Sequence, residues 1–205
     1  MQFEIKSRRT RSVIFTAEIE ADESASASIK LGLAVKVAVK ARANLGGAYL
    51  GGAYLGGAYL GGANLGGANL GGANLRGANL GDAYLGGAYL GDAYLGGAYL
   101  GDAYLGGAYL GGANLNGTCG LNPWIKNIQV EDWPISYTSD VMQIGCQRHS
   151  FDAWRNFSDA EIRAMDGRKA LDFWKKWKSW IFQTIDMAPA QPTKAADPVE
   201  TEAAE

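Results

Sequence analysis

The most regular feature of the chain is a five-residue pattern of apolar and polar positions between residues 43 and 117. Alanine opens each repeat and leucine follows two positions later, in fifteen consecutive phrases such as ANLGG, AYLGG and AYLGD. A period of five matches neither a helix, with about 3.6 residues per turn, nor a flat strand, with about two. A chain that turns one corner per repeat puts every Ala and Leu on the same side, because glycine at the corner accepts a positive φ. The pattern therefore predicts a coil with Ala and Leu inside and the second position outside.

The predicted core of this coil consists of the leucines at the third position of the repeats. A buried leucine contributes about 1.5–3 kcal/mol, so fifteen of them suffice for a short rod. These core positions are Leu45, Leu50, Leu55, Leu60, Leu65, Leu70, Leu75, Leu80, Leu85, Leu90, Leu95, Leu100, Leu105, Leu110 and Leu115.

The A-[N/D]-L-x-x phrase of these repeats resembles the pentapeptide repeat family. The resemblance implies a mainly β fold in which the fifteen repeats of residues 43–117 wind as a right-handed quadrilateral β-helix, with four repeats, hence 20 residues, in each of about four coils. The chain departs from the family at the second position, where nine repeats carry tyrosine instead of asparagine or aspartate. The implied register stacks second positions one coil apart, so that Tyr84 shares a row with Tyr104 and Tyr89 shares a row with Tyr109.

Residues 1–42 are predicted to form a hairpin and a cap for the first coil. Apolar alternation in residues 3–5 and 15–19, on either side of the basic turn RRTR, indicates two strands. The segment IKLGLAVKVAVKA at 29–41 also alternates, which argues for a third strand. It resembles, however, the helix that precedes the first repeat in phage-type pentapeptide repeat proteins, and we favour a helix over 29–41. Either structure covers a strand edge that otherwise invites aggregation.

Residues 118–187 have a different composition and are predicted to form a small α+β domain over the last coil. This segment holds all six tryptophans and the single histidine. Apolar runs at 125–130, 135–138 and 141–144 indicate strands, Ser158 and Glu161 form a capping box that opens a helix, and Gly167 is placed to close it. Apolar positions 170, 174, 177, 181 and 185 then share one helical stripe. The segment resembles terminal domains of phage-type members of the family, and the tail at 188–205 is predicted to be disordered.

Charge and composition limit the classes of partner and compartment. The formal net charge is -2 and the pI is about 5.5, which predicts no general affinity for nucleic acid or anionic lipid. The apolar run at 29–41 contains lysines and is too short to span a bilayer. The first residues show no apolar stretch typical of a secretory signal. Two cysteines are too few for a disulfide scaffold, and we expect a cytoplasmic protein.

Cys146 and His149 are the one pair of residues that suggests a reactive centre. A thiolate needs a base or a positive neighbour, but the chain has no second histidine and no orienting group is evident. Zinc would need four ligands, and Cys119, Cys146, His149 and Asp152 show no recognised spacing. We therefore predict no catalytic residue, no metal and no cofactor, and a buried cysteine beside a structural histidine.

The candidate interaction surface is aromatic. Outward tyrosine rows suit contacts through ring faces and hydroxyls at little entropic cost, although stacked rings could equally serve only to stabilise the coil. Tryptophans at helical spacing suit either core packing or an interface, including a homodimer. The candidates are Tyr49, Tyr84, Tyr89, Tyr94, Tyr99, Tyr104, Tyr109, Trp174, Trp177 and Trp180.

Three functions follow from these patterns. The favoured one is a non-enzymatic rod that docks on an unidentified protein partner, in a setting such as phage–host conflict. The alternative is a DNA mimic that inhibits or protects a topoisomerase-like enzyme. Duplex DNA shows one charge per ~1.7 Å, so a tower of ~18 Å needs on the order of ten negative charges, whereas the repeats offer Asp82, Asp92 and Asp102 opposed by Arg76. An enzyme that uses Cys146 and His149 is the weakest hypothesis.

Overall fold

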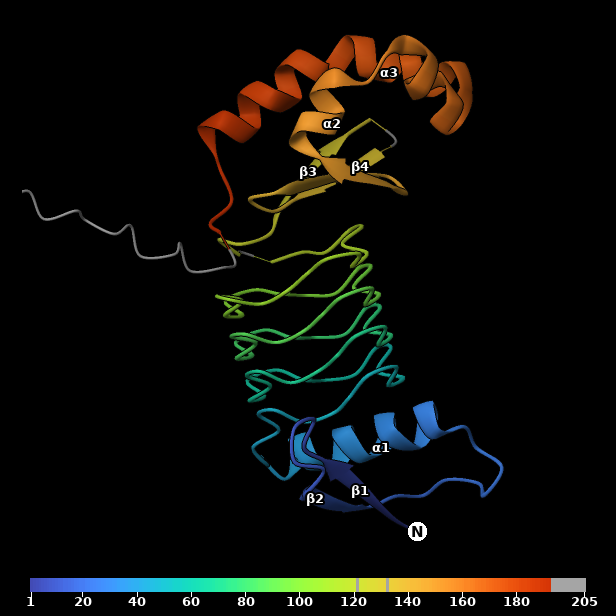
Figure 1. The fold of residues 1–205 in the computed structure, drawn as a ribbon, viewed down its shortest axis with the longest axis vertical. Helices are drawn as coiled ribbons and strands as arrows, with labels where there is room; N and C mark the ends of the chain where they lie inside the picture. The colour runs from blue at the N-terminus through green and yellow to red at the C-terminus, as the bar shows by residue number, and fades with distance from the viewer. Residues whose placement is uncertain (121, 132, 193–205) are drawn as a thin grey trace, which may run out of the picture.

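The computed structural model describes residues 1–120, 122–131 and 133–192. It shows a stack of coils with a hairpin and one helix at the N-terminal end, and a sheet covered by helices at the other end (Figure 1). The N-terminal elements are β1 (Gln2–Lys6), β2 (Val13–Glu18) and α1 (Ala27–Lys40). The C-terminal elements are β3 (Lys126–Val130), β4 (Trp133–Tyr137), β5 (Val141–Ile144), β6 (Gln147–Ser150), α2 (Phe151–Asn156) and α3 (Asp159–Met187).

The N-terminal end consists of the expected hairpin followed by a helix. β1 and β2 pair antiparallel, and their inward residues Ile5 and Ala17 are fully buried. The segment that could have been a strand is the helix α1, which starts two residues earlier than predicted because the Ser26 side chain accepts the amide hydrogen of Ile29 as an N-cap. Its small and branched residues at 34, 35 and 38 are buried in the same core as the coils, which decides the choice in favour of a helix.

The repeats wind into coils of 20 residues. Parallel bridges join second-position residues that are 20 apart, as in Tyr49 to Asn69, Asn69 to Tyr89 and Tyr89 to Tyr109, so four repeats make one turn. The repeat leucines are at most 6% exposed, whereas the repeat tyrosines are 40–76% exposed. The corner residue has a positive φ near 60° and is glycine or, at 82, 92 and 102, aspartate, which tolerates this region better than most residues. The repeat leucines thus point into the coil and the repeat tyrosines point out of it.

The coil continues slightly beyond the predicted boundary at 117. Cys119 forms a parallel bridge with Tyr99, and its amide donates to the carbonyl of Ala98 at 2.9 Å. Thr118 takes the place of the repeat alanine and is buried. The sequence hid this half-repeat because neither Thr nor Cys matches the A-N-L or A-Y-L phrase. We call residues 43–119 the tower.

The C-terminal segment forms a four-stranded antiparallel sheet in the order β3-β4-β5-β6. The three predicted strands are found within two residues, but the sequence prediction missed β6 and α2. The capping box of Ser158 and Glu161 opens α3 as predicted, and the helix is interrupted at Asp166 and Gly167, where Gly167 has φ 65°. The sheet lies between the tower and the two helices (Figure 1), so one of its faces is available to the last coil.

The prediction of a disordered tail from 188 is wrong for residues 188–192. The hydroxyl of Tyr137 donates to the carbonyl of Ala188 at 2.8 Å, and the amide of Gln191 donates to the carbonyl of Pro123 at 2.7 Å. Ala190 is buried in the core of the sheet and helices. The composition of the tail did not reveal these contacts because they depend on distant residues. The rest of the tail, 193–205, lies outside the described residues.

Candidate interaction surfaces

Asparagine and tyrosine stabilise the outer corner of a repeat in different ways. In asparagine repeats the side-chain oxygen accepts the amide hydrogen two residues on, as Asn69 does from Gly71 at 2.9 Å. Tyrosine has no oxygen near the backbone and cannot form this turn. Its ring instead covers glycines: a Cβ on Gly66 would lie 2.5 Å from Cε1 of Tyr84, and one on Gly86 would lie 2.7 Å from the Tyr84 hydroxyl. The glycine-rich corners therefore make room for the rings.

Four tyrosines form two stacked pairs on adjacent sides of the tower. The rings of Tyr84 and Tyr104 are 5.3 Å apart with 1° between their planes. Those of Tyr89 and Tyr109 are 5.0 Å apart with 11° between their planes. All four remain 40–50% exposed, so stacking and exposure coexist in the same rings.

Trp124 extends one of these pairs toward the C-terminal domain. Its ring packs edge-on against Tyr104 with 5.0 Å between centroids. The sequence prediction missed this residue, although a signal was present, since Trp124 follows Tyr104 by one coil length of 20 residues. We call Tyr84, Tyr89, Tyr104, Tyr109 and Trp124 the aromatic wall.

The other candidate tyrosines are exposed but lie outside the stacked pairs. The guanidinium of Arg11 lies over the ring of Tyr49 at 5.2 Å. Tyr94 and Tyr99 are exposed, and each lies in a row whose lower neighbour is an asparagine. These positions are accessible, but they offer single rings instead of a continuous aromatic surface.

The tryptophans of α3 are mostly core residues, so the prediction that Trp174 belongs to a surface is wrong. Trp174 is 4% exposed, because the bend of α3 places it against Trp154, with 5.0 Å between ring centroids. Trp177 is half-buried and packs on Trp180 in an edge-on pair at 5.7 Å. Trp180 is 41% exposed and is the member of the series that faces solvent.

The tower meets the C-terminal sheet through polar side chains that bond to the last coil. Gln143 accepts the amide hydrogen of Leu115 at 3.1 Å, and Ser136 donates to the carbonyl of Leu115 at 2.8 Å. Arg148 donates to the carbonyl of Leu110 at 3.1 Å. Burial lowers the pKa of the Arg148 guanidinium, against the opposing influence of Tyr109 and Asp92. These side chains replace the next coil as hydrogen-bond partners of the backbone edge.

Cys146 and His149 are not assembled into a reactive pair. The His149 ring lies edge-on to Trp154 and Phe157, at 5.2 and 4.8 Å between centroids. Burial lowers the pKa of its imidazole, and its buried Nε2 has no hydrogen-bond partner. Cys146 is exposed, contrary to the expected buried cysteine. Among the residues that the structure describes, no group of three His, Cys, Asp or Glu side chains could hold a metal ion.

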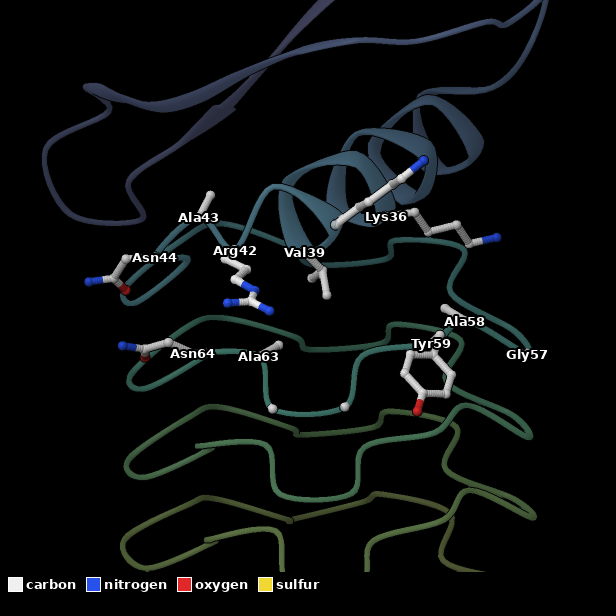
Figure 2. Close-up of a pocket in the computed structure, with 13 residues that line it drawn as sticks. Lys36, Val39, Arg42, Ala43, Asn44, Gly57, Ala58, Tyr59, Ala63 and Asn64 are labelled. Atoms are coloured by element: carbon white, nitrogen blue, oxygen red, sulfur yellow. The ribbon is translucent and has the colours of Figure 1, made fainter.

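A cleft of about 850 Å³ opens between the end of α1 and the first coil. Figure 2 shows Val39 and Arg42 on the helix side of this cleft, opposite Ala58 and Tyr59 on the coil. Its charged lining residues are Lys36, Lys40 and Arg42, and no carboxylate lines it. We call it the basic cleft. Sequence analysis missed it because it depends on how α1 crosses the coil.

Across the described ranges, none of the helices has the length and apolar character needed to cross a bilayer. The search for similar proteins found no match among curated proteins.

Solved structures similar to the chain are pentapeptide repeat proteins. The protein alr5209 from Nostoc PCC 7120 is 50% identical over 35% of this chain and 60% of its own, with a TM-score of 0.34. HetL from Nostoc sp. strain PCC 7120, described as involved in heterocyst differentiation regulation, is 39% identical over 37% of each chain, with a TM-score of 0.27. A protein of the Arabidopsis thaliana thylakoid lumen is 32% identical over 38% of this chain and 55% of its own, with a TM-score of 0.25. The chain thus spans less than two thirds of the length of these relatives.

The repeats themselves give the assignment. The family described as "Pentapeptide repeats" matches residues 43–82 and 78–117, with 8 copies. These two matches together cover the whole five-residue pattern. The segment folds as a solenoid with leucine inside and the second position outside, as the family phrase requires. Residues 43–117 are therefore pentapeptide repeats, and the similarity to this family lies in that segment of the chain.

Proposed function

We propose that this chain is a non-enzymatic scaffold that docks on a protein partner through the aromatic wall. Pentapeptide repeat proteins are generally non-enzymatic and often act in protein interactions. The observation that carries the proposal is the two stacked, half-exposed tyrosine pairs, one of which Trp124 extends. Tyrosine and tryptophan bury large areas at low entropic cost and are frequent hot-spot residues. A surface of this kind suits a partner with an apolar and hydrogen-bonding face.

We further propose that the tower is a quadrilateral β-helix with a cap at each end. The division is 1–42 for the N-terminal cap, 43–119 for the tower and 120–192 for the C-terminal domain. The coil length of 20 residues supports one repeat per side. The bonds of Lys6 and Ser28 to the first coil, and of Ser136 and Gln143 to the last, support the two caps.

The setting is also part of the proposal. Two exposed cysteines without a disulfide suit a reducing compartment such as the cytoplasm. A role in phage–host conflict rests on the resemblance of the terminal segments to those of phage-type proteins. The low acidity of the tower continues to disfavour DNA mimicry.

The experiment compares the proteins that bind to the full-length chain and to two matched variants. In the first variant, Tyr84, Tyr89, Tyr104 and Tyr109 are each replaced by asparagine, which occupies this position in six repeats and forms its own turn. In the control variant, the same change is made at Tyr54, Tyr59, Tyr94 and Tyr99, which lie in the other rows. We expect a partner whose affinity falls at least tenfold with the first variant and is retained by the control. Equal retention by both folded variants would exclude the aromatic wall.

A further inference from the structure

The first coil has an unpaired backbone edge at Tyr59. Between coils, the amide of Leu60 donates to the carbonyl of Asn79, that of Gly62 to Gly81, and that of Asn79 to Ala58. A further coil on the N-terminal side would make the same three bonds with the amide of Tyr59, the carbonyl of Tyr59 and the carbonyl of Gly61. Within the described residues, none of these three groups has a hydrogen-bond partner in the protein.

On the two preceding sides of the same coil, the corresponding amide is bonded to an N-terminal element. The amide of Tyr49 donates to the carbonyl of Lys6 at 2.8 Å, and that of Tyr54 donates to the carbonyl of Ser28 at 3.0 Å. At Tyr54 the helix approaches so closely that a Cβ on Gly32 would collide with the Tyr54 carbonyl oxygen. At Tyr59, α1 has moved away from the coil and the basic cleft occupies the space (Figure 2). Within the described residues, the amide of Tyr59 is therefore free, whereas the amides of Tyr49 and Tyr54 are bonded to the N-terminal elements.

The cleft carries positive charge without a counterion. Lys36, Lys40 and Arg42 line it, and all three are exposed. In the described part of the chain, none of them forms an ion pair. Tyr59, at 76%, is the most exposed of the repeat tyrosines, and half-buried Val39 offers an apolar contact on the opposite wall.

Arg42 is held in a backbone conformation that favours glycine. It follows the C-cap Ala41 with φ 54°. The amide of Arg42 donates to Val39 and that of Ala43 to Ala38, which is the Schellman arrangement that most often has glycine at this position. A non-glycine residue here costs stability, and such outliers concentrate at functional sites. Arg42 faces the cleft (Figure 2), so the strained position also presents a charge.

We propose that the basic cleft binds an extended acidic peptide, which adds as a β-strand to the edge at Tyr59. The peptide offers one carbonyl to the Tyr59 amide and two amides to the carbonyls of Tyr59 and Gly61, and its carboxylates face Lys36, Lys40 and Arg42. Backbone bonds supply affinity and side chains supply selectivity in strand addition. A phosphodiester strand fits less well, because it cannot donate to two carbonyls. The site is separate from the aromatic wall and does not rest on it.

The test measures binding of a seven-residue capped peptide of alternating glutamate and valine to the full-length protein by fluorescence anisotropy. We expect saturable binding that weakens with salt and is lost when lysine replaces each glutamate. N-methylation of the alternate peptide amides that donate to the coil should abolish binding. N-methylation of the other amides, which point away from the coil, should not. Equal affinity for the glutamate, glutamine and lysine peptides, or no binding at all, would overturn the proposal. Tighter binding of single-stranded oligothymidine would overturn it in favour of nucleic acid.

Protein variants locate the site and separate function from folding. Lys36→Gln and Lys40→Gln should each weaken peptide binding about two- to fivefold. Lys30→Gln on the same helix is the control, because Lys30 points its ammonium to the carbonyl of Glu23 outside the cleft, and it should change nothing. Arg42→Gly should weaken binding while raising the melting temperature, since it relieves the strained backbone. A variant at Arg42 that bound as tightly as the parent would remove this residue from the site.

Discussion

The ring of Tyr84 lies parallel to the ring of Tyr104, with 5.3 Å between centroids and 1° between planes. This spacing is close to the ~4.8 Å between paired strands. It follows from the backbone bridge between the same two residues. The ladder is thus a direct product of the 20-residue coil, and Trp124 adds a perpendicular ring at its upper end.

The first prediction concerns the stability of this ladder. In a double-mutant cycle with Tyr84→Asn and Tyr104→Asn, we expect a coupling of about 0.5–1.5 kcal/mol from ring stacking. The control cycle pairs Tyr84→Asn with Tyr94→Asn, whose rows differ, and should show coupling near zero. Chemical denaturation of the four proteins in each cycle gives both numbers. A coupling no larger than that of the control would mean that the rings stack without stabilising the coil.

The second prediction concerns the modularity of the tower. Deletion of residues 81–100 removes one coil and joins Leu80 to Gly101 in the same register. Because the stability of a solenoid is roughly a sum of local units and their interfaces, we expect a protein that still folds cooperatively with a lower free energy of unfolding. Thermal denaturation followed by circular dichroism is the measurement. Loss of a cooperative transition would show that the ends depend on this particular coil.

The third prediction concerns Asn122, which ties the last coil to the C-terminal domain. Its buried amide donates to the carbonyls of Leu100 and Ala103, and its oxygen accepts from the amides of Trp124 and Ile125. The Leu100 carbonyl also accepts from the amide of Ala103, but Asn122→Ala leaves the Ala103 carbonyl and the amides of Trp124 and Ile125 without this partner, and we expect a loss of about 2–3 kcal/mol in the free energy of unfolding.

The matched control for Asn122 is Asn44→Ala. Asn44 is exposed and makes one local bond, to the amide of Gly46. We expect this control to cost about 0.5 kcal/mol. Urea denaturation compares the two, and a similar small loss for both would show that Asn122 does not hold the two parts together.

The fourth prediction concerns the pH dependence of stability near neutrality. Burial lowers the pKa of His149, so the unfolded chain takes up a proton at a higher pH than the folded chain does. The free energy of unfolding should therefore fall as pH decreases below about 6.5, the ordinary histidine value. It should be higher at pH 7.5 than at pH 5.5. Because the chain has a single histidine, His149→Phe should flatten this dependence while keeping a ring beside Trp154. An unchanged slope in the variant would assign the dependence to other groups.

The repeat sequence by itself determined the centre of the molecule. Each repeat leucine follows an alanine by two positions, so a five-residue period with a corner in each repeat fits one arrangement, in which residues such as Leu90 point inward and Tyr89 points outward. The rows of second-position residues required one further premise, the four repeats per coil that the resemblance to the pentapeptide repeat family implies. A periodic sequence determines these positions because each repeat packs on a similar repeat one coil away. The tertiary neighbours of a repeat can therefore be read from the repeat sequence itself.

Tertiary contacts decided what lies at the two ends. The alternation in residues 29–41 is compatible with a strand, but packing of Ala34 and Ala38 on the first coil stabilises a helix instead. Trp174 packs on Trp154 of another helix, Ala190 is buried in the same core, and Trp124 joins the aromatic wall because Tyr104 lies beside it. The basic cleft exists because α1 departs from the coil at Tyr59. Apart from the 20-residue spacing between Tyr104 and Trp124, these features depend on contacts between segments that share no sequence pattern.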